Sequence, residues 1–416
     1  SLFKNTIKGA EQFKNTGGNI SGIEALDDYT VTFTLTEPSS IFISLMATTS
    51  ASIVTKKAIE KNITIGTGPF TYNKKNDTEF AITLLKNNNY HLSDKENKKL
   101  PYIDSIAFNY IGDGEDQLSL FKEGKLDVIV EIPPESVTEI VQAQISNFQN
   151  NPSKYILGSQ TKLRTSFLNL NTSIIPFNNV KIRKAFSLAL NKEKIVNNVL
   201  KGEAFGPGNN GIVSPAIKNY SYSSVNGHKF NNTEAQKLLA EAGYPQGEGF
   251  PQVKLSVRNG ITSLRVALEI QKQLLANLNI NIEISSLLQK EIMVLNDSSQ
   301  TEMSLNTRLA EFPDPLSFLS IFYSANVPAS NKVSAYPNES RYKNAKFDNL
   351  YEQATTTLDE KKRYELCLQA DQIIAKDVPI IPLWYHEDYQ LIQASVKNYK
   401  SNPLSLQHLT HVKIEA

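Results

Sequence analysis

Apolar and polar residues alternate on both sides of the Asp27-Asp28 pair, near the start of the chain. After this pair, Val31 and Phe33 take every second position, so they would lie on one face of an extended strand. A pair of acidic residues between two such runs is typical of a tight turn. The pattern predicts a β-hairpin over residues 23–35.

Two later stretches each predict a strand, a helix and a second strand in succession. In the later stretch, Ala267, Ile270 and Leu274 recur at helical spacing between two runs of alternating apolar residues. A helix that joins two strands in this way connects them in parallel, with a right-handed crossover. The predicted elements are the strand 103–111, the helix 115–123 and the strand 126–130, and then the strand 253–257, the helix 263–277 and the strand 280–284.

Helix signals are frequent in the second half of the chain. An asparagine pair can cap a helix that runs to Leu190, and Asn191 can cap the next helix. Thr233 and Gln236 form a capping-box pattern at the start of a third helix. Further helices are predicted over 135–145, 347–356 and 360–375, and an apolar segment over 378–385. Strands and helices in alternation over 416 residues predict an α/β fold of two or three domains.

Charge and cysteine content exclude several classes of protein. Lys and Arg number 43 against 42 Asp and Glu, so no global field would attract nucleic acid or an anionic membrane. Cys367, the single cysteine, excludes an internal disulfide framework and multi-cysteine metal sites. No stretch reaches the roughly 20 apolar residues that span a bilayer. Because the chain opens at Ser1, we expect a processed form or a fragment.

Catalytic and metal-binding motifs do not emerge from the sequence. It contains no Gly-x-Ser-x-Gly, no phosphate-binding Gly-x-x-x-x-Gly-Lys-Ser/Thr and no His-Glu-x-x-His. His386, His408 and His411 lack a second pair of residues at ligand spacing, so we expect surface histidines. We expect Cys367 to be a small core residue and not a nucleophile. The chain is therefore expected not to be an enzyme and to need no cofactor or metal.

Several motifs, in a fixed order, resemble the family 5 solute-binding proteins, the peptide and nickel binders of ABC importers. The most specific is 176–195, in which a Pro-Phe turn introduces a basic, alanine-containing helix. The resemblance covers nearly the whole chain, although the family normally has a substantial segment before the hairpin. The other matching stretches are Gly-Thr-Gly-Pro-Phe at 66–70, Phe-Lys-Glu-Gly-Lys-Leu-Asp at 121–127, Phe-Pro-Asp-Pro-Leu-Ser-Phe at 312–318 and Asp-Val-Pro-Ile-Ile-Pro-Leu-Trp-Tyr at 377–385.

The resemblance implies a two-lobe, periplasmic-binding-protein-like clamp of type II-like form, with an extra subdomain. The expected divisions are a partial extra subdomain at 1–65, a discontinuous first lobe at 66–162 plus 399–416, and a second lobe at 163–398. Hinges are expected near Lys162 and Asn398, closing the clamp on a ligand. Without the usual opening strands, the first lobe is predicted to have unpaired sheet edges.

The same resemblance implies an extracytoplasmic binding protein that captures short peptides and delivers them to an ABC permease in the membrane. We expect a periplasmic or cell-surface monomer, with a lipid anchor as one option. Two alternatives stay open, since fold does not fix function. The cargo could be a metal chelate, an opine or a sugar, or the clamp could serve as a chaperone or interaction protein.

Candidate ligand contacts lie in two of the matching stretches. In peptide-binding relatives an acidic residue before the Pro-x-Pro-like turn pairs with the amino terminus of the peptide, and Glu311 stands at that position. Arg308 replaces a frequent aromatic residue, so the pocket could favour a carboxylate or another polar group beside the ammonium group. Phe312 and Asp314 complete this candidate loop, although a turn or cap role suits Asp314 better.

A second pair of candidates, Trp384 and Tyr385, follows the apolar segment near the end of the chain. Both could line the cleft. Aromatic side chains that follow an apolar strand are more often part of a core.

Overall fold

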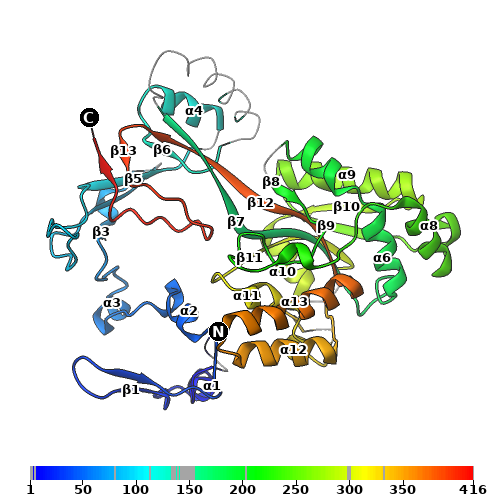
Figure 1. The fold of residues 1–416 in the computed structure, drawn as a ribbon, viewed down its shortest axis with the longest axis horizontal. Coiled ribbons are helices and arrows are strands. Elements are labelled where there is room, and N and C mark those ends of the chain that lie inside the picture. Colours follow the sequence, from blue (N-terminus) through cyan, green and yellow to red (C-terminus); the bar gives the residue numbers. More distant parts are fainter. Residues whose placement is uncertain are drawn as a thin grey trace. The chain divides into compact units, whose positions relative to one another are not determined.

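The computed structural model describes residues 3, 6–78, 81–111, 114–132, 137, 140, 155–201, 204–297, 301–330 and 333–415. The chain forms two compact units, which are described separately. Unit 1 comprises 1–51, 163–200 and 205–386, and unit 2 comprises 52–162, 201–204 and 387–416. Strands alternate with helices in both units (Figure 1), so the α/β class is confirmed.

The sheet of unit 1 combines parallel and antiparallel strands. Strand order is β10-β9-β11-β7-β12, and β8 pairs with β12. Strands β9 and β10 are parallel, in the register Leu255↔Ile284, which confirms the predicted strand–helix–strand unit, although the second strand begins at Glu283, three residues later than predicted. Its strands are β8 Ala204–Pro207, β9 Lys254–Arg258, β10 Glu283–Leu287, β11 Met303–Leu309, and parts of β7 Tyr155–Leu170 and β12 Ile380–Gln393.

Helices of unit 1 pack through apolar stripes, with α9 on strands β9 and β10 and α6 on α8 and α9. On α6, Ile182, Phe186 and Ala189 are at most 2% exposed, as the helical spacing of the sequence predicts. Burial of each large side chain stabilises the unit by about 1.5–3 kcal/mol. Helices α6, α8 and α9 contact one another. Their bounds and those of the shorter neighbours are α6 Val180–Ala189, α7 Lys192–Lys194, α8 Asn232–Glu241, α9 Ile261–Leu278 and α10 Gln289–Asp297.

Side-chain caps set where several of these helices begin. The side chain of Asn179 accepts from the Lys181 amide, and that of Asn191 accepts from the Lys194 amide. These caps agree with the predicted starts of the two helices. The predicted capping box at Thr233 is wrong, because α8 begins two residues earlier. Its N-cap is Asn231, whose side chain accepts from the Glu234 amide.

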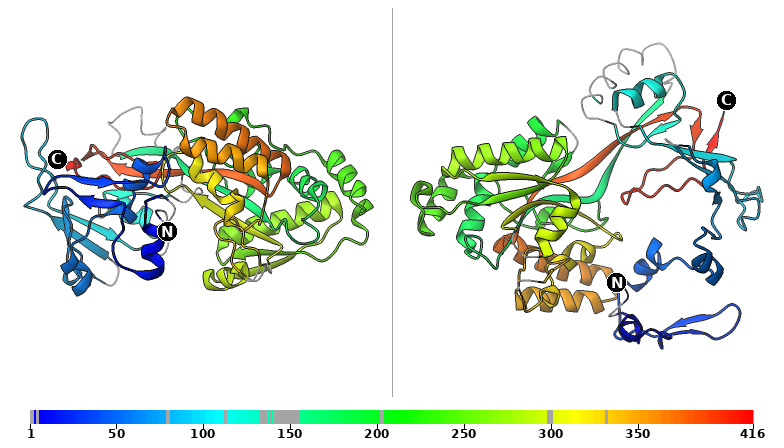
Figure 2. Two further views of the ribbon diagram at one scale, coloured as in Figure 1. Left: turned by 90° about the horizontal axis from the view of Figure 1, so that it is seen from below. Right: turned by 180° about the vertical axis from the view of Figure 1, so that it is seen from behind.

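Three helices near the end of unit 1 form a layer beside the candidate loop. Helices α12 and α13 lie side by side in both views of Figure 2, as their contacts require. They agree with the two helices predicted in this region, within two residues at each end. Their bounds are α11 Pro315–Leu319, α12 Ala345–Thr356 and α13 Glu360–Asp377.

The N-terminal segment of unit 1, which spans positions 1–51, contacts α12 through Ser40. Both the amide and the hydroxyl of Ser40 donate to the Thr355 carbonyl, at 2.8 and 2.9 Å. The predicted hairpin is confirmed, with Ala25 opposite Val31. The elements of this segment are α1 Ala10–Thr16, β1 Ile23–Ala25, β2 Val31–Phe33 and α2 Phe42–Met46.

Unit 2 contains a three-stranded antiparallel sheet in the order β3-β4-β5. Phe121 and Leu391, each 1% exposed, belong to an apolar cluster around α4 and the end of β12. The elements are α3 Lys56–Lys61, β3 Phe70–Tyr72, β4 Ala81–Lys86, β5 Ser105–Asn109, α4 Gly114–Lys122, β6 Val128–Ile129, β13 Val396–Lys397 and β14 Lys413–Ile414. The helix predicted over 135–145 falls largely outside the described residues.

The predicted parallel pairing of the strands on either side of α4 is wrong. Strand β5 pairs with β4, whereas β6 pairs antiparallel with β12, with Ile129 opposite Leu391. The partner of β6 therefore comes from the far end of the chain. Local periodicity finds the strand and the helix, but it carries no signal for so distant a partner.

Two of the passages of the chain between the units lie inside long strands. On β7 the passage is at Lys162 and Leu163, where a hinge is expected, and on β12 it is at His386 and Glu387. The second expected hinge, near Asn398, lies within unit 2. The assignment of residues 1–65 to a separate subdomain remains a prediction.

Candidate functional site

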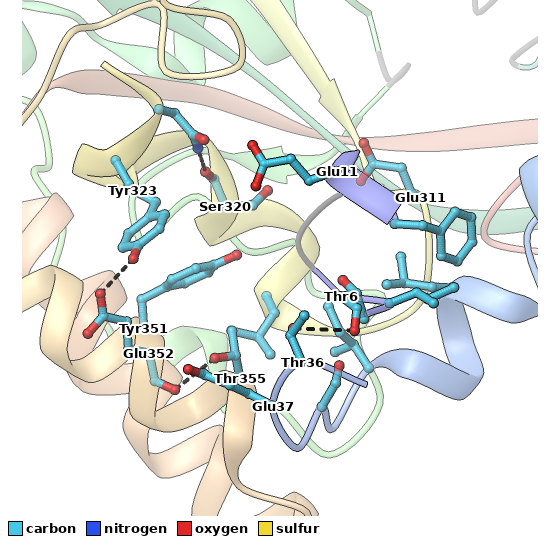
Figure 3. A pocket seen from close by; sticks show the side chains of 18 of the residues that line it. Thr6, Glu11, Thr36, Glu37, Glu311, Ser320, Tyr323, Tyr351, Glu352 and Thr355 are labelled. Carbon is cyan, nitrogen blue, oxygen red and sulfur yellow. Dashed lines mark hydrogen bonds between the residues drawn. The ribbon is translucent and has the colours of Figure 1, made fainter. Parts of the chain in front are cut away.

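A large cavity opens within unit 1, between the N-terminal segment and the layer of α11 and α12. Its volume is about 2150 Å³, and its walls include parts of α1, α11 and α12. Figure 3 shows side chains from both parts of the unit directed into it. Among the candidates named from sequence, Arg308, Glu311 and Phe312 line this cavity.

Arg308 and Glu311 form an ion pair on the cavity wall. Nη2 of Arg308 lies 2.6 Å from Oε2 of Glu311, and the side chains are 12% and 32% exposed. Nε of Arg308 donates to the Ser317 carbonyl at 2.9 Å. The hydroxyl of Ser317 donates to Oε2 of Glu311 at 2.6 Å and accepts from the Glu311 amide at 2.9 Å. The carboxylate is thereby held in one orientation.

Helix α11 places Ser317 in this arrangement. The helix begins after Asp314, whose Oδ1 accepts from the Leu316 amide at 3.0 Å, and proline occupies its first position. Oδ2 of Asp314 lies 3.1 Å from Nε of Arg363 on α13. Asp314 is 4% exposed and does not line the cavity. The structure therefore gives it the cap role that suits its position better than a ligand contact.

Two sets of polar atoms at the ion pair remain available to a ligand. Within the described chain, Nη1 of Arg308 donates no hydrogen bond and Oε1 of Glu311 accepts none. A carboxylate has room for about four hydrogen bonds, and a guanidinium carries five N–H groups. A ligand could place a cationic donor at Oε1 and a carbonyl or carboxylate oxygen at Nη1.

The other aromatic candidates lie elsewhere in unit 1. Trp384 and Tyr385 are 6% and 1% exposed and belong to the core, and the Tyr385 hydroxyl donates to the Gly211 carbonyl at 2.8 Å. Neither lines the cavity. A role for these two in ligand binding has no support from their position.

Several residues that line the cavity were not predicted from the sequence. Glu11 and Glu37 come from the N-terminal segment, and Tyr323, Tyr351 and Glu352 from the region of α12. The two regions lie far apart in the sequence, so no local pattern connects them. The hydroxyl of Tyr323 donates to Oε1 of Glu352 at 2.6 Å, as Figure 3 shows.

The surface location expected for His386 is wrong. Its ring is half-buried, and Nε2 lies 2.8 Å from the Ser166 hydroxyl. Burial, reinforced by the positive charge of Arg164, lowers the pKa of His386 to about 3. His408 and His411 are exposed, as expected, and Cys367 is buried.

The described residues contain neither a metal-binding cluster nor a membrane-spanning helix. No group of three His, Cys, Asp or Glu side chains among the described residues is arranged to hold a metal ion. No described helix combines the length and the apolar character that crossing a bilayer requires.

The chain is similar to several known peptide-binding proteins. The chain is 25% identical over 413 residues to the dipeptide-binding protein DppE of Bacillus subtilis (strain 168), covering 96% of this chain and 71% of that protein. It is similar to the crystal structure of the periplasmic oligopeptide-binding protein OppAIV of Borrelia burgdorferi, with a TM-score of 0.77 and 27% identity. That match covers 100% of this chain and 80% of the other.

A second solved structure is similar over nearly the same extent. It is the periplasmic binding protein DppA of Helicobacter pylori in complex with the peptide STSA, with a TM-score of 0.75 and 25% identity, covering 97% of this chain and 75% of that one. These similarities confirm the expected clamp fold class. The profile of the bacterial extracellular solute-binding proteins, family 5 Middle, matches residues 2–330. The chain belongs to the family 5 bacterial extracellular solute-binding proteins.

Proposed function

We propose that this protein captures short peptides and delivers them to an ABC permease. The ion pair of Arg308 and Glu311 on the cavity wall carries this proposal. The ammonium group of the peptide binds Oε1 of Glu311, and Nη1 of Arg308 donates to the first peptide carbonyl. Neither atom makes a hydrogen bond within the described chain.

The interaction energy at Glu311 favours a ligand with an ammonium group. A charge-assisted hydrogen bond between an ammonium group and a carboxylate contributes about 1.5–3 kcal/mol. Ser317 and Arg308 already fix the carboxylate, so little conformational entropy is lost when the peptide binds. The peptide main chain supplies the remaining contacts, and these tolerate different side chains.

The similar proteins support the same class of cargo. The relatives named above are called dipeptide- and oligopeptide-binding proteins, and one was solved with the peptide STSA. A peptide cargo is therefore a stronger proposal than a metal chelate, an opine or a sugar. Delivery to a permease, a location outside the cytoplasm and a monomeric state follow from the family as further proposals.

Native mass spectrometry of the purified chain, incubated with a mixture of short peptides, tests the proposal. We expect a ladder of peptide masses on the protein, and loss of that ladder in Glu311→Gln but not in Glu248→Gln, an exposed position outside the cavity. A single non-peptide mass that peptides cannot displace would favour the alternative cargo. No bound mass, together with no thermal shift, would favour a chaperone or interaction protein.

A further inference from the structure

The charge of the cavity differs from that of the whole chain. The chain carries a net charge of +1. Among the described residues that line the cavity, the charged side chains are those of Glu11, Glu37, Arg308, Glu311 and Glu352. Because Arg308 pairs with Glu311, their charges cancel locally. Glu37 and Glu352 therefore make the described lining beside α12 negative, and a low-dielectric concave wall strengthens their field.

The backbone at the C-terminal end of α12 adds to the negative potential around Glu352. It lies about one turn before the end of the 12-residue helix α12, whose C-terminal end carries about half a negative charge. Thr355 and Thr356 at that end also line the cavity. The hydroxyl of Tyr323 holds the Glu352 carboxylate at 2.6 Å. A cation in this part of the cavity would meet both the carboxylate and the helix end.

Glu37 acts on the same part of the cavity from the other wall. The hydrogen bond to Glu352 and burial raise the pKa of Tyr323 to about 12, and the charges of Asp348 and, to a smaller extent, Glu37 add to this shift. The two carboxylates thus influence one tyrosine from segments far apart in sequence. Within the described chain neither Glu37 nor Glu352 forms an ion pair with Lys, Arg or His.

Aromatic faces complete this part of the cavity. The rings of Tyr323 and Tyr351 have centroids 5.2 Å apart, and both residues line the cavity beside Glu352 (Figure 3). Tyrosine faces attract ammonium and guanidinium groups. The described carboxylates are too dispersed to hold a metal ion. An organic cation on a flexible arm fits such an arrangement better than a metal does.

We propose that Glu37, Glu352, Tyr323 and Tyr351 bind a lysine or arginine side chain of the peptide, so that the protein selects basic peptides. This inference rests on the proposed function, since Glu311 and Arg308 take the amino terminus. Selection requires the cavity as a whole, because one wall supplies Glu37 and the other supplies Glu352 and both tyrosines.

Calorimetry with matched peptides tests the selection. Tetra-alanine is compared with peptides in which one lysine, or one norleucine, replaces the second, third or fourth alanine. Norleucine keeps the apolar arm of lysine and lacks the charge. We expect at least one lysine peptide to bind about 10-fold more tightly than its norleucine match, and the advantage to shrink at high ionic strength.

The variant Glu37→Gln with Glu352→Gln provides the decisive comparison. Both side chains are exposed, so we expect the variant to fold. It should lose the preference for lysine and retain the affinity for tetra-alanine. Circular dichroism checks folding, and Glu37→Gln alone, which should lose part of the preference, replaces the double variant if that one unfolds.

Two results would overturn the inference. The first is equal affinity for the lysine and norleucine peptides. The second is a preference for lysine that survives in the double variant. Both results would leave the proposed peptide capture intact. If no peptide binds, tetra-alanine included, the proposed function itself fails and the inference fails with it.

Discussion

Nη2 of Arg308 lies 2.6 Å from Oε2 of Glu311, with both side chains on the wall of one cavity. The ion pair occupies one oxygen of the carboxylate and leaves the other to a ligand. It also turns the guanidinium so that Nη1 remains available. A single pair can therefore present an acceptor and a donor side by side, which is what the amino end of a peptide requires.

Ser317→Ala should weaken peptide binding several-fold. The Ser317 hydroxyl fixes the Glu311 carboxylate at 2.6 Å, and its loss lets that carboxylate rotate. The Glu311 amide also loses its acceptor, which should cost folding about 1–2 kcal/mol. Calorimetry and thermal unfolding measure the two effects. Unchanged peptide affinity would show that the orientation of Glu311 is unimportant.

Asp314→Ala should destabilise the fold by about 3–5 kcal/mol, because it leaves Arg363 buried without a carboxylate. Glu283→Ala is the matched control. It breaks the exposed pair with Lys254, at 3.2 Å, and should cost no more than about 1 kcal/mol. Urea unfolding measures both. Similar losses in the two variants would contradict the structural role of Asp314.

Asp371 should make stability depend on pH. It is fully buried, and burial raises the pKa of its carboxyl group to about 6, against the opposing effect of hydrogen bonds from Ile212, Val213 and Tyr220. The carboxyl group thus holds its proton more tightly in the folded state than in the unfolded state. Its contribution to the free energy of unfolding is therefore present below about pH 4 and is lost as pH rises through about 6.

The variant Asp371→Asn removes this titration. The free energy of unfolding of the variant, minus that of the wild type, should increase between pH 4 and pH 7 by about 2–2.5 kcal/mol. Urea unfolding at a series of pH values measures the difference. A difference that stays constant with pH would contradict the prediction.

Gly211→Ala should destabilise unit 1 by about 1–3 kcal/mol, because the added methyl group would overlap the Asp371 carboxylate. Gly206→Ala is the control, since a methyl group there meets no atom within 4 Å. Thermal unfolding compares the two variants. A Gly211→Ala protein as stable as Gly206→Ala would show that Asp371 can move aside.

Local sequence patterns predict the helices and strands better than they predict which strands pair with each other. The strands around α9 were predicted with their parallel pairing, because a helical connection of this length brings neighbouring strands together. The pairing of β6 was missed, because its partner near Leu391 lies far along the chain. At α8, two capping residues stand close together, and the structure uses Asn231 and not Thr233.

In the candidate site, too, residues close together in the sequence could be predicted, and residues brought together from distant segments could not. Arg308, near the end of β11, and Glu311 and Phe312, just after that strand, lie within five consecutive residues, so a family motif could identify them together. Glu37 and Glu352 join the cavity only because the N-terminal segment contacts α12, through Ser40 and Thr355, which are 315 positions apart. A contact over such a distance leaves no periodicity in the sequence.

The most direct measurement is a binding cycle at Glu311. Calorimetry would compare a short peptide with its amino-acetylated form on the wild type and on Glu311→Gln. If Glu311 binds the ammonium group, the substitution should weaken the free peptide about 10- to 100-fold and leave the acetylated peptide nearly unchanged. Equal losses for both peptides, or no loss for either, would contradict the proposed capture of the amino terminus.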